Sequence, residues 1–426
     1  MKRTTVKIAV TTALLLSSSS VFATNGSVLI GTGTKIRGMA GTGIGIGHGA
    51  ESALSNPAFI TSVKNIDISF GGTLFMPNVK NKNNLVVPAG NPGAGTVYNT
   101  GFENSTADKG VIPEISIATK INEHFYVGLG MWGTAGMGVD YRDTKGPLEG
   151  GTQFKMVTNL QLMQFGAPLA YKTHGLSLAV TPILQYGSLD MNYVSTNSAG
   201  NEEKSNGAGV GQDLKFGYNI GLSYERSGFT IGAVYKSQIN MDYKDQLKSA
   251  MAGFGVEYKN TQLSTPSEYG VGVSYRLGAS SFAIDCKKIK WSTAKGYKDF
   301  KWNDQNVFAL GYKYTTEKWI ARFGYNYGKS PVKEQALGSM GSIVPGHPEQ
   351  GDKAGLINTL NLLGFPGIVK SHYSLGGTYA LNEVVSVDLA YIYAPEVSAT
   401  YKNFAGQDIT TKHSQQSVSF QMTYDF

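Results

Sequence analysis

The chain ends on Ser417-Val418-Ser419-Phe420-Gln421-Met422-Thr423-Tyr424-Asp425-Phe426, and these residues carry the clearest structural pattern of the sequence. Every second residue from Val418 to Phe426 is apolar, and every residue between them is polar. Successive side chains of a β-strand point to opposite faces, so this period of two gives one apolar and one polar face. A strand with lipid outside and a polar lumen inside has that pattern. The edge strand of a soluble sheet can also alternate, but it seldom exposes so apolar a face up to its last residue.

Comparable segments recur along the chain, and their count of about fourteen is an even number within the range of bacterial barrels. The segments are Ile66–Met76, Val111–Ile121, Phe125–Tyr141, Lys155–Tyr171, Leu176–Tyr193, Gln212–Glu225, Phe229–Tyr243, Glu268–Arg276, Ser281–Trp291, Asn306–Tyr314, Trp319–Gly328, Ile368–Ala380, Val384–Tyr393 and Ser414–Phe426. Tight turns and long loops alternate strictly between them, as periplasmic turns and external loops do. The sequence therefore predicts an all-β fold, a transmembrane antiparallel β-barrel of about 14 strands formed by residues 66–426.

The N-terminus has the features of an export signal. Three basic residues precede a short apolar core, Ile8–Leu16, and small residues around Ala23 provide a cleavage site. The apolar run is too short for a spanning helix, which needs about 20 apolar residues. We expect residues 1–23 to be a signal peptide and the mature chain to begin at Thr24. An exported membrane protein without spanning helices has to be a closed barrel, because lipid offers no partner to backbone polar groups.

The composition agrees with a barrel. Charged residues make up 16% of the 426 residues, well below the roughly 25% of soluble domains. The mean hydropathy of −0.16 is compatible with a lipid-exposed wall, because residues facing a polar lumen offset those facing lipid. The formal net charge of +7 is mild and no basic run is dense, so nucleic-acid binding is not expected.

Cysteine and histidine give no sign of metal, thiol or cofactor chemistry. The single cysteine, Cys286, rules out an internal disulfide, and its strand-like surroundings predict a small side chain that is buried or faces lipid. The six histidines have no metal-ligand spacing. An outer-membrane phospholipase would need a Ser–His pair at strand level on the lipid face, and no histidine falls in such a place. We therefore expect no enzyme, no metal site and no cofactor.

Several short motifs, in this order along the chain, resemble one family. Ser55-Asn56-Pro57-Ala58 follows a glycine-rich stretch that includes Arg37-Gly38 and glycines 41, 43, 45, 47 and 49. The further motifs are Gly217-Tyr218-Asn219-Ile220-Gly221-Leu222, Tyr235-Lys236-Ser237, Trp291-Ser292, Ala309-Leu310-Gly311 and the run from Tyr325 through Ser330-Pro331-Val332. Together they resemble the FadL-type outer-membrane transporters of long-chain fatty acids and hydrocarbons (OmpP1/FadL/TodX-like), from about Thr24 to Phe426.

The resemblance implies a fourteen-stranded barrel whose lumen is plugged by an N-terminal hatch, here residues 24–65. It implies that ligand collects in a hydrophobic groove on the outer loops and then moves to a tighter site in the lumen. Ligand then leaves sideways through a gap in the wall, beside a kinked third strand next to the Asn-Pro-Ala motif. The C-terminal Phe426 resembles the signature that the barrel-assembly machinery reads. We expect a monomer surrounded by outer-membrane lipid.

Two groups of residues are candidates for the hatch and the lateral gate. Asn56-Pro57-Ala58 predicts a rigid bend that leaves the hatch, because proline fixes φ and lacks a donor; an ordinary turn is the alternative. The third strand contains Gly128, Gly130 and Gly133, and its alternation is lost near Thr134. Glycine inside a strand marks a bulge or a close approach. A break in the ladder there would open the wall, whereas glycines that ease the tilt of the barrel are the alternative.

A fatty-acid carboxylate needs a cation or strong donors in an apolar pocket. Strand phase points Lys236 and Arg322 inward, together with Lys313. Lys298 lies where the family has a ligand-contacting lysine, judged by its spacing from the following strand, and Lys301 is close to it. Lys298 is the first choice among these cations. The alternative for each is a solvated lumen charge that pairs with an acid such as Asp242 or Asp285.

The long loops carry apolar patches at helix-like spacing. One patch is Leu247, Met251 and Phe254, and a second runs from Leu356 to Phe365. Exposed apolar surface usually marks a binding site, so these residues are candidates for the ligand-collecting groove; loops that pack on each other and close the barrel are the alternative. Where the family often has an apolar residue that reaches the ligand, this chain has Gly26, so Val28 or Leu29 would have to serve.

The sequence thus favours a gated transporter of hydrophobic molecules, with long-chain fatty acids as the first substrate class. An uptake channel for aromatic hydrocarbons or alkanes is an alternative within the same fold. A general water-filled porin is an alternative of another class, but it would have charged rings, a loop folded into the lumen and no N-terminal plug. Conduction of ions and sugars across planar bilayers would favour the porin.

Overall fold

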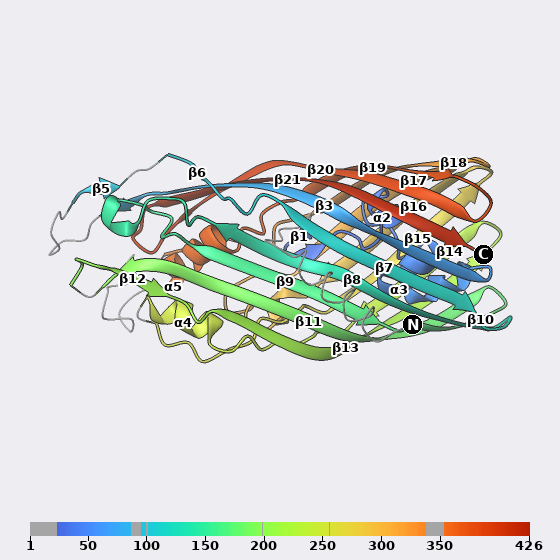
Figure 1. Cartoon of the computed structure of the whole chain (residues 1–426), viewed down its shortest axis with the longest axis horizontal. Helices are drawn as coiled ribbons and strands as arrows, with labels where there is room; N and C mark the ends of the chain where they lie inside the picture. The colour runs from blue at the N-terminus through green and yellow to red at the C-terminus, as the bar shows by residue number, and fades with distance from the viewer. Residues whose placement is uncertain (1–23, 87–94, 99–100, 198, 255, 338–352) are drawn as a thin grey trace, which may run out of the picture.

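The computed structural model describes residues 24–86, 95–98, 101–197, 199–254, 256–337 and 353–426. The signal peptide predicted for residues 1–23 lies outside them. The described chain forms a closed antiparallel barrel of fourteen wall strands (Figure 1). Each wall strand pairs with its neighbours in the chain, and the cylinder closes where β21 pairs with β3, from Ile409 opposite Asn83 to Asp425 opposite Asp67. The predicted fold class and strand count are confirmed.

The wall strands are long and tilted. Their bounds are β3 Ile66–Asn83, β7 Gly110–Lys120, β8 Phe125–Asp140, β9 Val157–Gly166 with β10 Leu169–Thr173, β11 Leu176–Thr196, β13 Val210–Arg226, β14 Phe229–Lys236, β15 Glu268–Leu277, β16 Ser280–Ile289, β17 Gln305–Thr315, β18 Trp319–Gly328, β19 Ser371–Ala380, β20 Val385–Lys402 and β21 Asp408–Asp425. β9 and β10 count as one wall strand that is interrupted at Ala167-Pro168.

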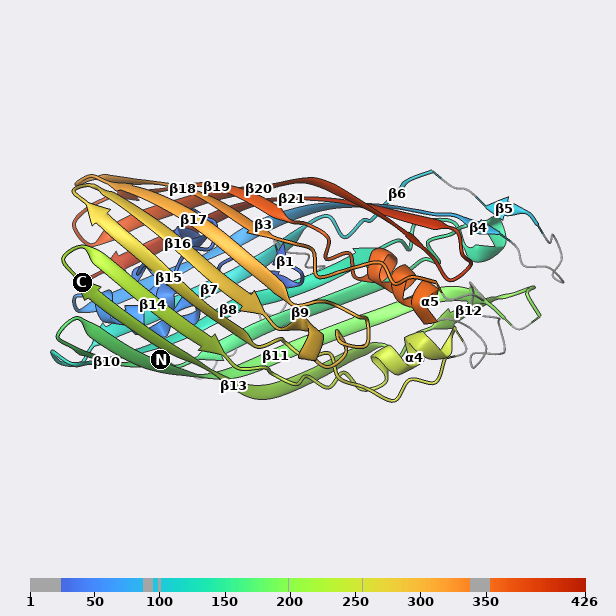
Figure 2. The same cartoon turned by 180° about the vertical axis from the view of Figure 1, so that it is seen from behind.

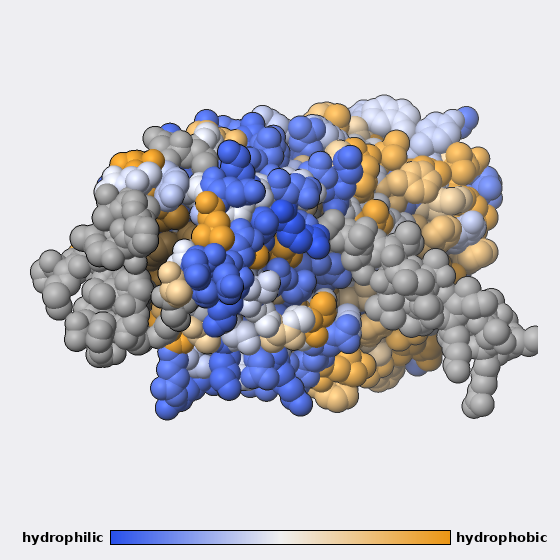
Figure 3. Space-filling view, turned by 60° about the vertical axis from the view of Figure 1, so that its left-hand side comes forward, coloured by the Kyte–Doolittle hydropathy of each residue, from blue (hydrophilic) through white to orange (hydrophobic). Residues whose placement is uncertain are grey.

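Alternation of side chains explains why these segments build a barrel in lipid. On β21, Val418 and Phe420 are 43% and 47% exposed, whereas Ser417 and Ser419 are fully buried. Apolar residues gather at the end of the barrel that carries the tight turns and the C-terminus, and hydrophilic residues cover the wall beyond them (Figure 3). Cys286 points outward with the apolar residues of β16. The outward apolar face and inward polar face predicted for the last strand are both present.

Several strands, among them β3, β11, β20 and β21, continue far beyond the apolar band. On β3 the outward residues are apolar up to Met76 and polar from Asn78 to Lys82. The predicted loop 394–413 is wrong for most of its length, because β20 runs to Lys402 and β21 begins at Asp408. Outside the bilayer both faces of a strand can meet water, so the ladder continues although the apolar alternation has ended.

Three other strands are interrupted or shorter in the structure than the sequence predicts. Lys155–Tyr171 is split at Pro168, because proline has no N–H for the ladder. Phe229–Tyr243 ends at Lys236, and the residues after it turn into the interior, where Met241 and Tyr243 are buried. The strand predicted for Ile368–Ala380 begins only at Ser371, because the residues before it lie in the interior, where Ile368 is buried.

The external loops form a packed apolar layer over the lumen (Figure 2). This layer includes α4 (Gln246–Ala252), α5 (Lys353–Thr359) and the π-helical turn Leu360–Gly364. The remaining short elements are β4 Leu85–Val86, β5 Val97–Tyr98, β6 Glu103–Asn104, β12 Glu203–Asn206 and the 3-10 helices Pro147–Glu149 and Trp291–Thr293. None of the helices in the described part of the chain has the length and apolar content needed to cross a bilayer.

The N-terminal residues lie inside the barrel and contact its inward faces (Figure 1). We call residues 24–65 the hatch. Its elements are β1 Thr24–Asn25, β2 Val28–Leu29, α2 Thr34–Arg37, the 3-10 helix Gly49–Glu51, α3 Ser52–Ser55 and the 3-10 helix Pro57–Ser62. Asn56 caps the last of these helices, because its side-chain oxygen accepts the N–H of Ala58 at 3.2 Å.

Candidate ligand site in the lumen

The middle of the hatch is tied to the wall by one carboxylate. The side chain of Asp285, on β16, accepts the N–H groups of Gly43, Ile44 and Gly45 at 2.7, 2.8 and 3.0 Å. Such close approach requires glycine, because a Cβ on Gly45 would overlap the backbone of β15 at Gly272. Asp285 is therefore engaged by backbone donors and is not the ion-pair partner of a lumen cation that the sequence suggested.

Asn56 fixes the next part of the hatch. Its side-chain N–H₂ donates to the carbonyl of Ile44 at 2.9 Å and to the carbonyl of Leu222, on β13, at 3.0 Å. Gly221 lies so close that a Cβ there would be 2.8 Å from the ring of Pro57. Asn56-Pro57-Ala58 is thus a hatch–wall contact with β13, and the 3-10 helix that begins at Pro57 also contacts the glycine-rich β8. Ala58 and Pro57 are both buried.

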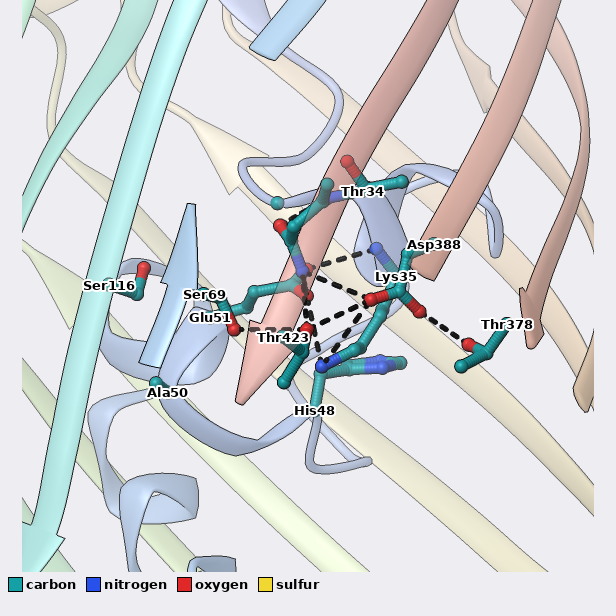
Figure 4. Close-up of polar contacts among 12 residues, drawn as sticks. Thr34, Lys35, His48, Ala50, Glu51, Ser69, Ser116, Thr378, Asp388 and Thr423 are labelled. Atoms are coloured by element: carbon teal, nitrogen blue, oxygen red, sulfur yellow. Dashed lines mark hydrogen bonds and ion pairs between the residues drawn. The ribbon is translucent and has the colours of Figure 1, made fainter. Parts of the chain in front are cut away.

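A buried ion cluster holds the base of the hatch (Figure 4). We define this base cluster as Lys35, Glu51, Arg322 and Asp388. Lys35 Nζ lies 3.5 Å from Glu51 and 3.8 Å from Asp388, and Glu51 also accepts the Lys35 N–H at 3.0 Å. Arg322 lies 3.9 Å from Asp388 and donates to Thr378 at 2.6 Å. The cluster contains two cations and two carboxyl groups, so each cation has a carboxyl partner.

Burial perturbs the base cluster. It raises the pKa of Glu51 to about 7, an effect that Lys35 opposes and Asp388 reinforces. For Lys35, burial acts to lower the pKa, but the carboxylates of Asp388 and Glu51 outweigh it and raise the pKa. Arg322 was a candidate for the ligand carboxylate, and the structure places it in this cluster between hatch and wall. A buried pair that loses one partner leaves an uncompensated charge.

A cavity of about 80 Å³ lies between the hatch and the wall above the base cluster. Its apolar lining comes from the hatch residues Val28, Leu29 and Ile30 and from wall and loop residues such as Ile239 and Ile289. Val28 and Leu29 both line the cavity. They are the two residues that the sequence offered in place of an apolar side chain at Gly26. Apolar walls with a few convergent polar groups are typical of ligand sites.

Three charged side chains meet at one side of this cavity, and we call them the lysine triad. The carboxylate of Glu268 lies 3.0 Å from Lys236 Nζ and 3.3 Å from Lys287 Nζ. All three line the cavity, and the side chains of Glu268 and Lys287 are only 5% and 11% exposed. Each ammonium carries three donors, so two ammonium groups that share one carboxylate keep donors for a further anion. Lys236 was a predicted ligand cation, and the structure places it in this site.

Polar atoms without a partner also face the cavity. Among the described residues, the Asn219 Nδ2, the Asn326 Oδ1 and the Thr134 Oγ1 are buried and make no hydrogen bond to protein. Buried polar groups are normally satisfied, and an exception needs an explanation such as a water or a ligand. These atoms give the cavity hydrogen-bonding capacity in addition to the lysine triad.

The wall is incomplete where it borders the cavity. β7 pairs with β8 from Lys120 opposite Tyr126 to Glu114 opposite Trp132, whereas β8 continues to Asp140. Beyond Trp132 this edge of β8 meets the hatch instead, with Ala135 opposite Val28. On the other edge, the register with β9 shifts between Gly133 and Ala135. The irregularity therefore falls at Thr134, where the alternation of the sequence is lost.

The glycines of β8 make room for close neighbours. A Cβ on Gly128 would lie 2.6 Å from the carbonyl oxygen of Ile117, and one on Gly133 would lie 2.6 Å from Ile112 Cγ2. Gly130 lies under the indole of Trp132, whose Nε1 donates to Ser116 Oγ at 2.7 Å. Trp132 is buried on the lumen side of the broken ladder.

Lys298, the first choice among the ligand cations, and Lys301, which is close to it in the sequence, lie outside the cavity lining. Lys298 and Lys301 are exposed, whereas the aromatic side chains Trp291, Tyr297 and Trp302 around them are buried and packed together with ring centroids 4.7–5.0 Å apart. Spacing from the next strand located this segment, but it did not fix which side chains face inward. Neither Lys298 nor Lys301 is among the residues that line the cavity.

The candidate residues of the loop groove are mostly inaccessible. Leu247 is fully buried and Met251 is 8% exposed. Phe254 is half-buried between the rings of Tyr193 and Phe404, with centroids 4.9 and 5.7 Å away. The patch from Leu356 to Phe365 is buried in the same apolar layer. In this structure the described loops pack on each other, which is the alternative that the sequence left open.

Sequence reasoning missed Lys287 and Glu268. Lys287 follows Asp285 by two residues, so strand phase places it on the same inward face, and Glu268 begins the strand that pairs with it. That signal was available, but the pairing of two lysines on one glutamate was not, because it depends on strand register. Within the described chain, no group of three or more histidine, cysteine or acidic side chains could hold a metal ion.

The structure is a closed barrel with a segment folded into its lumen. Its cavity has a largely apolar wall and a few polar and charged side chains. This architecture suits a transport protein for hydrophobic compounds. The family model described as "Outer membrane protein transport protein (OMPP1/FadL/TodX)" matches residues 14–338. The chain belongs to this family, whose members are transport channels of the outer membrane and not enzymes.

Individual relatives are distant. The chain is 24% identical to a 47 kDa outer membrane protein of Pasteurella multocida, over 98% of both chains. A crystal structure of a Pseudomonas aeruginosa FadL homologue is similar with a TM-score of 0.70 and 18% identity, covering 94% of this chain and all of that one. The Pseudomonas putida toluene transporter TodX is similar with a TM-score of 0.65 and 16% identity, covering 95% of this chain and 100% of that one. These likenesses establish the fold.

Proposed function

We propose that this protein carries long-chain fatty acids, or similar hydrophobic molecules with an anionic head, across the outer membrane. Ligand is captured at the external loops, binds in the lumen cavity and leaves sideways through the wall between β7 and β8. The observation that carries the proposal is the cavity that joins an apolar wall to the lysine triad, beside the irregular part of β8.

The chemistry of the cavity suits both ends of such a ligand. An acyl chain gains about 0.8 kcal/mol for each methylene removed from water, which the apolar lining supplies. A carboxylate entering the cavity would receive charge-assisted hydrogen bonds from Lys236 and Lys287, and these are about twice as strong as neutral ones. Sideways exit keeps the chain out of periplasmic water, because the molecule passes directly from the lumen to lipid.

The size of the cavity requires movement. Its volume of about 80 Å³ is roughly half of the 150 Å³ of an engineered apolar cavity that binds benzene. A long acyl chain would therefore displace part of the lining. Val28 is the residue to move, because it lines the cavity and also lies opposite Ala135 on the unpaired edge of β8. Displacement of β2 would enlarge the cavity and free the edge at once.

Monoaromatic hydrocarbons are the second candidate substrate class. The chain resembles a structure described as a toluene transporter and one described as a monoaromatic hydrocarbon channel, and a small cavity favours a small ligand. The two classes differ in their need for a cation. Mass spectrometry of the ligand released from gently purified protein would distinguish the two substrate classes. We expect a fatty acid, and an aromatic hydrocarbon would contradict the proposal of fatty-acid transport.

A disulfide across the wall tests the exit route. A Cβ on Gly133 would lie 3.8 Å from the Cβ of Ile112, which is the mean separation in disulfides. We expect Ile112→Cys with Gly133→Cys, in a Cys286→Ala background, to reduce uptake of labelled fatty acid at least about tenfold when oxidised. Uptake should return on reduction, and the single Ile112→Cys variant should take up ligand normally, because it leaves Gly133 in place. Undiminished uptake by the oxidised protein would exclude exit at this place.

A further inference from the structure

A groove lies in the wall where β19 ends and β20 continues. β19 pairs with β20 only as far as Tyr373 opposite Tyr393, and β20 runs on to Lys402 with β21 as its partner. The space beside this free edge is a groove of about 300 Å³. It is lined by Tyr327, Lys329, Val332, Lys370, Val397 and Tyr401, among others.

The mouth of the groove lies at the upper limit of the apolar band. Tyr327 and Tyr373 are outward-facing and 36% and 52% exposed at the ends of β18 and β19. Aromatic residues of this kind mark the level of the lipid head groups. Beyond them, the outward residues of β20 are polar, from Glu396 to Lys402. A molecule in the groove would therefore meet both head groups and the aqueous outer wall.

Two lysines stand at this level side by side. Lys329 and Lys370 are exposed and lie on neighbouring segments, since the Gly328 N–H donates to the Lys370 carbonyl at 2.9 Å. Neither lysine forms an ion pair with any residue that the structure describes. Among the described acids of the surrounding segments, Glu396 lies 3.7 Å from Lys412, and Glu334 accepts the Lys402 N–H at 3.0 Å.

The inner side of the groove is apolar and fixed. Val332 is buried and Val397 is half-buried, and the hydroxyl of Tyr401 donates to the Val332 carbonyl at 3.2 Å. The bulge between Ala394 and Val397 turns this part of β20 so that Val397 and Tyr401 face the groove. The site therefore combines two unmatched ammonium groups at its mouth with an apolar floor.

We propose that this groove binds the phosphate-bearing head group of an outer-leaflet lipid of the phosphorylated glycolipid type. Lys329 and Lys370 hold the phosphate, and an acyl chain lies along the tyrosines below. Two neighbouring ammonium groups match a phosphate better than a single carboxylate, because a phosphate monoester carries about −1.5 to −2 charges at neutral pH. Location at the head-group level makes a membrane lipid the occupant and not a diffusing solute.

The test is lipid retention by the purified full-length protein. Protein in neutral detergent is mixed with bisphosphorylated lipid A, and bound lipid is measured by native mass spectrometry. We expect Lys329→Gln and Lys370→Gln to weaken binding about fivefold each, and about 30-fold together. The Lys329→Arg/Lys370→Arg variant should bind like the unchanged protein. Lys64→Gln/Lys318→Gln is the matched control, because both lysines are exposed at the turn end of the barrel.

Two further arms identify the occupant. Uncharged detergent and phosphatidylcholine should not compete, and millimolar inorganic phosphate should not displace lipid A. Displacement by inorganic phosphate alone would replace the lipid site with a free-anion site and overturn the proposal. Equal binding by the Lys329→Gln/Lys370→Gln variant and the unchanged protein, with both correctly folded by circular dichroism, would also overturn it.

Discussion

Two groups of buried charges lie in the same lumen, and they differ in how their charges are matched. In the base cluster, Lys35 and Arg322 face Glu51 and Asp388, so every cation has a carboxylate. In the lysine triad, Lys236 and Lys287 share Glu268, while Asp285 nearby is occupied by three backbone N–H groups. The first group joins hatch to wall, and the second faces a cavity.

The difference shows that an inward-facing cation is not by itself a ligand site. Arg322 and Lys236 have the same strand phase, yet Arg322 lies in a cluster that has two carboxyl groups for two cations, whereas Lys236 shares the single carboxylate of Glu268 with Lys287. A buried charge without a matching partner carries a large desolvation penalty. An incoming anion lowers that penalty in the lysine triad, but it would have to displace an existing partner in the base cluster.

Removal of Asp388 tests the base cluster and should have the largest effect. Asp388→Ala leaves Lys35 and Arg322 with one carboxylate between them, and loss of one partner from a buried pair costs about 3–5 kcal/mol. We expect the free energy of unfolding in detergent, followed by tryptophan fluorescence, to fall by that amount. Glu123→Ala is the control, because its ion pair with Lys120 at 2.8 Å is exposed and should not matter. An unchanged free energy for Asp388→Ala would remove the anchoring role.

Asn56 provides a neutral anchor for comparison. Asn56→Ala leaves the carbonyls of Ile44 and Leu222 without their donor, and each unsatisfied buried group costs about 1–3 kcal/mol. We expect a loss of about 2 kcal/mol in stability and reduced uptake of hydrophobic ligand, with normal barrel assembly in the outer membrane. Asn303→Ala, at an exposed position, serves as the control. Uptake at the unchanged level would argue against a role for this contact in transport.

Glu51 gives the base cluster a pH dependence of smaller size. Its pKa of about 7 lies above the ordinary value of 4.5, so the folded hatch retains a proton that the unfolded chain releases. Its contribution to stability is therefore complete below about pH 4.5 and is lost as pH rises through 7. We expect hydrogen-exchange protection of the Lys35 amide, corrected for intrinsic rate, to fall between pH 5 and pH 8.

The Glu51→Gln variant is the control for this pH effect. It keeps a side-chain oxygen for the Lys35 N–H but cannot titrate, so protection should be flat across the same pH interval. A matching decline in Glu51→Gln would assign the effect to another group.

The wall could be predicted from the sequence because its cause is local. Alternation between lipid and lumen is imposed on each strand by a period of two, and Val418–Phe426 carries that signal without reference to any other residue. The extended ends of β3, β20 and β21 escaped prediction because outside the bilayer no apolar face is required. Pro168 did not reveal its break in advance, since proline is also tolerated at strand edges.

The candidate site could be predicted only in part. Lys236 lies on a strand, so its direction followed from phase, and it lines the cavity. Lys298 and Lys301 lie in a loop, where no periodicity fixes direction, and both are exposed. Lys287 and Glu268 became a pair through the register of β15 and β16. Matched and unmatched cations look alike in a sequence, because the distinction depends on distances between strands.

The most direct test of the central claim compares a long-chain fatty acid with its methyl ester. Both have the same apolar chain, and only the acid presents a charge to Lys236 and Lys287. Charge-assisted hydrogen bonds contribute about 1.5–3 kcal/mol, so the purified protein should bind the acid roughly 10- to 100-fold more tightly by calorimetry. Lys236→Gln/Lys287→Gln should abolish the preference and keep ester affinity. Equal affinities for acid and ester in the unchanged protein would contradict the claim.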